Sequence, residues 1–227
     1  MEETIIAVGN GGYNLASDLI AAQLFPNARL IVCDTDEKDL EKHSVNAAAS
    51  FLFEKLHGKV KSGYTPFVGD IVAKASDSVI VCTTLGGMTG SKFAPLIALE
   101  AILKGKFVCS FFSMPYESEG EQKMNRAMNA RMQLIASSNF FVQQNNDRLK
   151  EVESLGSSDI NKPLVETVKS AMSHLPLEEL ANDINHEVLQ AYIPEEYHVT
   201  GIPLVMIRGD VYPGITDENR KEIFNLW

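Results

Sequence analysis

Short apolar runs rich in β-branched residues alternate with longer segments of helical periodicity over the first two thirds of the chain. The runs predict strands at residues 4–8, 29–33, 78–82, 107–112 and 140–143, and the segments between them predict helices at 14–24, 93–103, 119–137 and 163–175. Runs such as "SVIVC" and "FVCSFF" are apolar at every position, which is typical of strands covered on both faces. The order predicts an α/β fold with a doubly wound, mostly parallel, Rossmann-like sheet.

The alternation weakens near residue 152, where the polar segment "ESLGSSD" follows. We therefore predict a nucleotide-binding core over residues 1–152 and a C-terminal helical extension over 153–227, packed on the same domain. A last strand is expected at 203–207 ("PLVMI").

Composition excludes several classes of protein. No apolar run approaches the roughly 20 residues of a membrane span, and "MEETIIAV" has no basic segment typical of a signal peptide. A net charge of −10 argues against nucleic acid or an anionic membrane as partner. Cys33, Cys82 and Cys109 lie in apolar runs without CxxC spacing, which favours core thiols over a disulfide or metal site. A cytoplasmic location is expected.

The first predicted strand is followed directly by a glycine-rich segment, "GNGGYN". Its residues are Gly9, Asn10, Gly11, Gly12, Tyr13 and Asn14. Glycines before a helix let backbone N–H groups approach an anion, although a tight turn would also explain them. A dinucleotide fingerprint would have a small residue where Asn14 stands, so the match to an NAD-binding enzyme is weak, even though Asp34 would suit a ribose hydroxyl.

A second glycine-rich segment, "LGGMTGSKFAP", follows the third predicted strand. It contributes Gly86, Gly87, Met88, Thr89, Gly90 and Ser91. Two such segments entering two helices at one sheet edge predict a site for a polyphosphate, with hydroxyls donated by Thr89 and Ser91. The Walker pattern GxxxxGK[ST] is absent from the sequence, so backbone groups rather than a dedicated lysine would hold the phosphates.

Five motifs in order resemble the FtsZ/tubulin GTPase family, and its bacterial FtsZ branch in particular. They are "VGNGGYN", "CDTD", "LGGMTGSKFAP", "MPYESEGEQKM" and "NNDRL", which all lie within residues 4 to 150. The resemblance implies a cytoplasmic cell-division type of protein that binds GTP or GDP, with Mg2+ bridging the phosphates. It also implies self-association or a division or segregation protein as partner.

The resemblance also implies roles for single residues. Gly11, Gly12 and Asn14 would line the first phosphate loop and the base side, and Gly86, Gly87, Thr89, Gly90 and Ser91 would surround the β- and γ-phosphates. Glu119 would bind the ribose, Lys123 would lie near the sugar and phosphates, and Asn146 would read guanine, together with Asp159 or Asn161. Asp36 and Pro115 join the site as members of matched motifs. The matched motifs assign neither a catalytic residue nor a protein ligand for a metal.

Each assignment has a plainer alternative. Glu119 could simply begin a helix, where a carboxylate is favourable, and Asn146 could simply make a turn. Met124, Met128 and Met132 recur every four residues and are interpreted as core.

The sequence also departs from the family pattern. Met88 and Lys92 replace glycines, Asn145 replaces a proline, and residues 57–76 lack the family's loop that closes on the γ-phosphate. "ANDINHE" has carboxylates at the wrong spacing for the family's activation loop, and the stretch after Leu175 is too short for its second domain. Hydrolysis is therefore expected to be weak. The alternative is a degenerate FtsZ-like interaction module that acts through a protein partner with little or no turnover.

Overall fold

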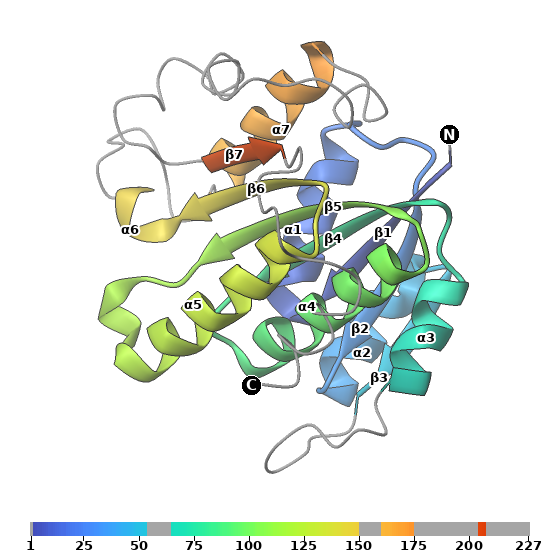
Figure 1. The fold of residues 1–227 in the computed structure, drawn as a ribbon, viewed down its shortest axis with the longest axis horizontal. Coiled ribbons are helices and arrows are strands. Elements are labelled where there is room, and N and C mark those ends of the chain that lie inside the picture. The colour runs from blue at the N-terminus through green and yellow to red at the C-terminus, as the bar shows by residue number, and fades with distance from the viewer. Residues whose placement is uncertain (1, 54–64, 150–159, 175–203, 208–227) are drawn as a thin grey trace.

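A computed structural model describes residues 2–53, 65–149, 160–174 and 204–207. The described residues form one sheet of seven strands in the order β3-β2-β1-β4-β5-β6-β7 (Figure 1). The strands are β1 (Glu3–Val8), β2 (Arg29–Asp34), β3 (Ala49–Leu52), β4 (Ser78–Thr84), β5 (Phe107–Met114), β6 (Phe140–Asn145) and β7 (Leu204–Ile207). Strands β1 to β6 are parallel, and β7 pairs antiparallel with β6. The doubly wound α/β prediction is confirmed.

The helices between the strands cover both faces of the sheet. They are α1 (Gly9–Ala21), α2 (Glu37–His43), α3 (Thr65–Ala73), α4 (Met88–Leu103), α5 (Glu121–Ala136), α6 (Asn146–Leu149) and α7 (Lys162–His174), with short 3₁₀ turns at Ser44–Asn46 and Glu117–Glu119. Buried residues of α1, α2 and α7 form one apolar layer, and those of α3, α4 and α5 form the other. Within β1, Ile5 and Ala7 join the first layer while Ile6 and Val8 join the second, which explains the continuous apolar run.

Four of the helices and strands were not predicted from the sequence, namely β3, α2, α3 and the short α6. β3 is an edge strand in which Leu52 is exposed, and α2 is polar apart from Leu40 and His43, which are buried. Neither shows the apolar periodicity on which the prediction relied, and neither does α3 in its first turn, "TPF". The expected last strand is present as β7.

Helices α1 and α4 begin five residues earlier than predicted. The first turn of α1 contains the glycines of the first segment, Gly9, Gly11 and Gly12. Helix α4 begins at Met88 and contains Gly90 in its first turn, while Gly86 and Gly87 directly precede it. Glycine is a poor helix former, so propensity alone argued for a later start. Close packing of Gly11, Gly12 and Gly90 against β4 overrides that propensity.

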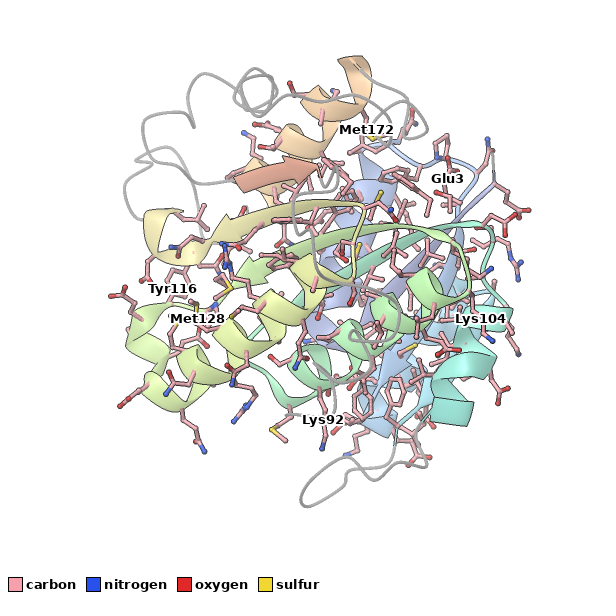
Figure 2. The ribbon with its side chains drawn as sticks, in the orientation of Figure 1. Glu3, Lys92, Lys104, Tyr116, Met128 and Met172 are labelled. Atoms are coloured by element: carbon pink, nitrogen blue, oxygen red, sulfur yellow. The ribbon has the colours of Figure 1, made fainter. Side chains whose placement is uncertain are left out.

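Helix α5 corrects the interpretation of the methionines. Met128, which is labelled in Figure 2, is 45% exposed and Met132 is 64% exposed, so their assignment to the core is wrong. Met124 is partly buried against the core. The buried stripe of α5 consists of the smaller Ala127 and Ala130 with Leu134. The three cysteines are buried free thiols, as predicted, and burial raises the pKa of each. Among the described helices, none is long and apolar enough to cross a membrane.

Candidate functional site

The sheet reverses its winding direction at β1 and β4. These strands are neighbours, and α1 leaves the end of β1 toward one face while α4 leaves the end of β4 toward the other. The N-termini of both helices therefore meet at the carboxyl edge of the sheet. This is the topological switch point, where doubly wound proteins bind their ligands.

Both helix N-termini lack a side-chain cap among the described residues. The N-cap positions are Val8 for α1 and Gly87 for α4, and neither makes a capping hydrogen bond through a side chain. The first N–H groups of a helix have no acceptor within the helix, and they carry a partial positive charge. Two such ends at one edge favour an anionic ligand between them.

Close packing explains three of the glycines. A Cβ on Gly11 would lie 2.2 Å from Oγ1 of Thr84, one on Gly12 would lie 2.3 Å from the carbonyl oxygen of Cys82, and one on Gly90 would lie 2.4 Å from Oγ1 of Thr83. Only glycine lets α1 and α4 approach the end of β4 so closely. These glycines therefore have a structural reason that needs no ligand.

The remaining glycines of the two segments differ. Gly9 and Gly86 have φ values of +78° and +93°, which residues other than glycine rarely adopt. Gly87 has φ −70° and ψ 161°, and an added Cβ there would meet no atom within 4 Å. Neither backbone conformation nor packing within the described chain explains Gly87, which is exposed at the N-terminus of α4.

A polar cluster joins the end of β2 to the first turn of α4. The hydroxyls of Thr35 and Thr89 lie 2.6 Å apart, and Thr89 lies 3.5 Å from a carboxylate oxygen of Asp34. The same Asp34 oxygen accepts from the backbone N–H groups of Thr35 and Asp36, at 2.6 and 3.1 Å. Asp34 is 4% exposed, so its carboxylate serves the turn rather than a free binding edge. Asp36 in turn caps α2 by accepting from Lys38 and Asp39 N–H.

The side chains of α1 extend the site toward α2. Oδ1 of Asn10 lies 2.8 Å from Nε2 of His43, and the His43 ring stacks on Tyr13 with centroids 3.8 Å apart. Burial lowers the pKa of His43, and Lys42 lowers it further, while Asp39 and Asp34 oppose both effects. Sequence reasoning missed His43, because a lone histidine in a polar segment carries no recognisable signal.

Residues after β5 border the second glycine segment. Pro115 packs against Gly86, with atoms 3.1 and 3.2 Å from the position of an added Cβ. Glu119 accepts from Nζ of Lys123 at 3.0 Å and from the N–H of Tyr116 at 2.8 Å. Desolvation raises the pKa of Glu119, but the hydrogen bonds from Lys123 and Tyr116 outweigh it and leave the pKa below its usual value. Glu119 lies in the 3₁₀ turn before α5 rather than in the helix itself.

Asn146 begins α6 at the end of β6 and is 8% exposed. Its Oδ1 accepts from Nε2 of Gln144 at 3.1 Å. Gln144 also donates to the carbonyl of Ile160 and accepts from the N–H of Leu164, which connects β6 to the start of α7. Sequence reasoning missed Gln144, because a polar residue near the end of a strand carries no signal of a buried hydrogen-bonding role.

Four further predicted site residues lie on α1, on α4 and directly before α7. Asn14 is exposed on α1, Met88 is 55% exposed at the start of α4, and Oγ of Ser91 accepts from the N–H of Gly86 at 2.8 Å. Asn161 donates to Asp18 of α1 at 2.7 Å, and Asp159 lies outside the described residues. In the described part of the chain, no three His, Cys, Asp or Glu side chains gather in a way that could hold a metal ion.

The fold and this edge define a doubly wound α/β domain with two glycine-containing helix N-termini at its switch point. The chain belongs to the Tubulin/FtsZ family, whose GTPase-domain model matches residues 2–154.

Relatives of known identity agree with that assignment. The chain is 28% identical to the cell division protein FtsZ of Aquifex aeolicus over 159 residues, which is 65% of this chain and 43% of that protein. It is 30% identical to FtsZ of Mycoplasmopsis pulmonis over 160 residues, covering 65% and 40%. The match thus spans less than half the length of these relatives.

Solved structures share the fold. An empty FtsZ dimer from M. jannaschii superposes with a TM-score of 0.60 at 20% identity, covering 83% of this chain and 59% of that one. TubZ from the Clostridium botulinum phage c-st gives a TM-score of 0.62 at 18% identity, covering 89% and 75%.

Proposed function

We propose that this protein binds GTP and GDP, with the phosphates at the N-termini of α1 and α4. The observation that carries the proposal is the meeting of these two uncapped helix ends at the switch point, with Gly87 open beside them. A diphosphate or triphosphate supplies the negative charge that both ends favour. Membership of a GTPase-domain family supports guanine as the base.

The remaining contacts follow from the same arrangement. Glu119 and Lys123 would face the ribose, and Asn14 and Asn146, together with Asp159, would lie at the base. Oδ1 of Asn146 already accepts from Gln144, so its amide group is oriented with Nδ2 left to donate. A nucleotide-binding unit over 1–152, with 153–227 as an extension, is part of this proposal.

Magnesium belongs to the proposal only through the nucleotide. The described residues offer no three-carboxylate cage, and the carboxylate of Asp34 is already engaged by two backbone N–H groups. The residues present therefore do not fit a dedicated metal site. Binding with weak hydrolysis is the form of activity we favour, because "ANDINHE" has carboxylates at the wrong spacing for the family's activation loop. Action through a division or segregation partner, with little turnover, is the second candidate, and self-association and a cytoplasmic location complete the proposal.

Calorimetry with GTP, GDP, GMP and ATP tests the proposed function. We expect GTP and GDP to bind more tightly than ATP, because a site that hydrogen-bonds a base edge rejects an edge with the opposite donors and acceptors. GMP should bind least of the guanine nucleotides if the helix ends hold the outer phosphates. Equal affinity for ATP and GTP, or no binding of either, would contradict the proposal. Identification of any nucleotide released on denaturation gives an independent check.

A further inference from the structure

Arg126 reaches from α5 to the glycine segment before α4, a contact that the sequence motifs do not include. Its Nη1 donates to the carbonyl oxygen of Gly86 at 2.7 Å. Arg126 is half-buried and lies one helical turn after Lys123, whose own carbonyl approaches Gly86. The first two turns of α5 therefore pack against the segment that leads into α4.

Three successive peptide groups of this segment are held by three different donors or acceptors. The N–H of Gly86 donates to Oγ of Ser91 at 2.8 Å, which orients the peptide between Leu85 and Gly86. The carbonyl of Gly87 accepts from the N–H of Ser91 at 3.3 Å, which orients the peptide between Gly87 and Met88. The peptide between them, Gly86–Gly87, is oriented by Arg126.

That middle peptide has the least intrinsic resistance to rotation. A peptide plane can turn over by paired changes of ψ before it and φ after it, and glycines on both sides remove the Cβ clashes that would oppose the change. In a trans peptide, the carbonyl and the N–H point in opposite directions, and the structure contains no cis bond in its described part. With the carbonyl held toward Arg126, the N–H of Gly87 points to the opposite side of the segment.

We propose that Arg126 is a positioning residue that locks the Gly86–Gly87 peptide so that the N–H of Gly87 faces the nucleotide phosphates. This inference rests on the proposed function for the identity of the ligand. Without the lock, the competent orientation is only partly populated, and the apparent affinity falls by that fraction. A population of about one tenth would weaken binding about tenfold.

The test compares Arg126→Ala and Arg126→Lys with Arg131→Ala. Arg131 lies on the same helix and is also half-buried, but its Nε donates to the side chain of Gln143 on β6. We expect Arg126→Ala to raise the dissociation constant for GTP about tenfold. Arg126→Lys should recover most of the lost affinity, because the lysine ammonium can donate to the same carbonyl. Arg131→Ala should bind GTP like wild type. In ¹⁵N spectra of the ligand-free protein, the Gly87 amide should broaden or split in Arg126→Ala alone.

Salt separates positioning from simple attraction by the guanidinium charge. Between about 0.1 M and about 1 M salt the Debye length falls from about 10 Å to about 3 Å, so a long-range charge effect disappears. We expect the ratio of the Arg126→Ala affinity for GTP to the wild-type affinity to be the same at both salt concentrations. Unchanged affinity in Arg126→Ala, or a loss that vanishes at high salt, would overturn the inference. Absence of any nucleotide binding by wild type would overturn the proposed function instead, while the Gly87 spectrum would still test the lock.

Discussion

At the scale of single residues, the glycines near the switch point divide by physical cause. Gly12 and Gly90 are required because a Cβ would collide with backbone or hydroxyl atoms of β4, and Gly86 is required by its positive φ. Gly87 is subject to neither requirement. A side chain added there would affect chiefly whatever approaches the N-terminus of α4 from outside.

The exchange Gly87→Val tests this distinction. We expect weaker GTP binding, because the branched side chain would occupy the approach to the α4 N–H groups, and a free energy of unfolding that changes by less than about 1 kcal/mol. Gly12→Ala should instead lower the free energy of unfolding by about 1–3 kcal/mol, because the added methyl group overpacks against β4. Urea unfolding and calorimetry on the same samples measure both.

Gly69→Ala is the matched control for that experiment. Gly69 lies in α3, and a Cβ there would make only an ordinary contact, 3.8 Å from a carboxylate oxygen of Glu100. Alanine in a helix interior should stabilise the protein by about 0.5–1 kcal/mol without touching GTP affinity. Wild-type affinity in a folded Gly87→Val protein would show that the phosphates lie elsewhere.

At the scale of elements, α2 is coupled to α1 through one histidine. His43 ends α2, stacks on Tyr13 and contacts Asn10 in the first turn of α1. The sequence of α2, "EKDLEKH", has little apolar surface, so this contact and the burial of Leu40 carry much of its attachment to the domain. Protonation of His43 should therefore change the free energy of unfolding of the protein.

The stability of the protein should decrease in acid through His43. Burial, aided by Lys42 and opposed by Asp39 and Asp34, holds the pKa of His43 below its value in an unfolded chain, which is about 6.5. Below about pH 6.5 the unfolded chain binds the proton more readily than the folded one, so the free energy of unfolding falls until the folded pKa is passed. His43→Gln keeps a donor but does not titrate.

Unfolding curves from about pH 7.5 to about pH 5 compare the two proteins. The difference in free energy of unfolding between wild type and His43→Gln should shrink as the pH is lowered. Parallel curves would mean that His43 titrates alike in the folded and unfolded states. A constant offset between the curves reports the lost stacking on Tyr13 and does not affect the test.

At the scale of the whole molecule, two apolar layers on opposite faces bring two helix ends to one edge. Helix α1 belongs to the layer with α2 and α7, and α4 belongs to the layer with α3 and α5. The ends meet only because β1 and β4 are neighbours in the sheet. This arrangement forms the edge at which we propose that the phosphates bind, and the described residues there include no group of three that could hold a metal ion.

We expect the 227-residue chain by itself to hydrolyse GTP slowly or not at all, and not to form FtsZ-type filaments. Phosphoryl transfer needs an oriented water as well as bound phosphates. The segment "ANDINHE" has carboxylates at the wrong spacing for the family's activation loop, and a net charge of −10 disfavours stacking of copies. Phosphate release and light scattering over a range of protein concentrations measure both. Turnover that rises steeply with concentration, together with polymer, would contradict this expectation.

Much of the fold could be predicted from local patterns. The buried strands β1, β2, β4, β5 and β6 are apolar on both faces, so each was recognisable alone, and their alternation with helices was enough for the fold class. The edge strand β3 and the polar helix α2 could not be found in this way, because they bury little surface. Met128 and Met132 were predicted to be in the core but are exposed, because helical spacing cannot tell which face of α5 meets the sheet.

The sequence by itself determined the family, the succession of strands and helices along the chain and the two glycine segments, because these are properties of short stretches. Only the tertiary structure decided why each glycine is there, since that depends on the distance between α1 or α4 and the end of β4. The contacts of His43 with Asn10 and of Arg126 with Gly86 were likewise decided by the fold, because they join residues 33 and 40 positions apart. Contacts of that kind have no local signature, and the stacking of whole layers brings their partners together.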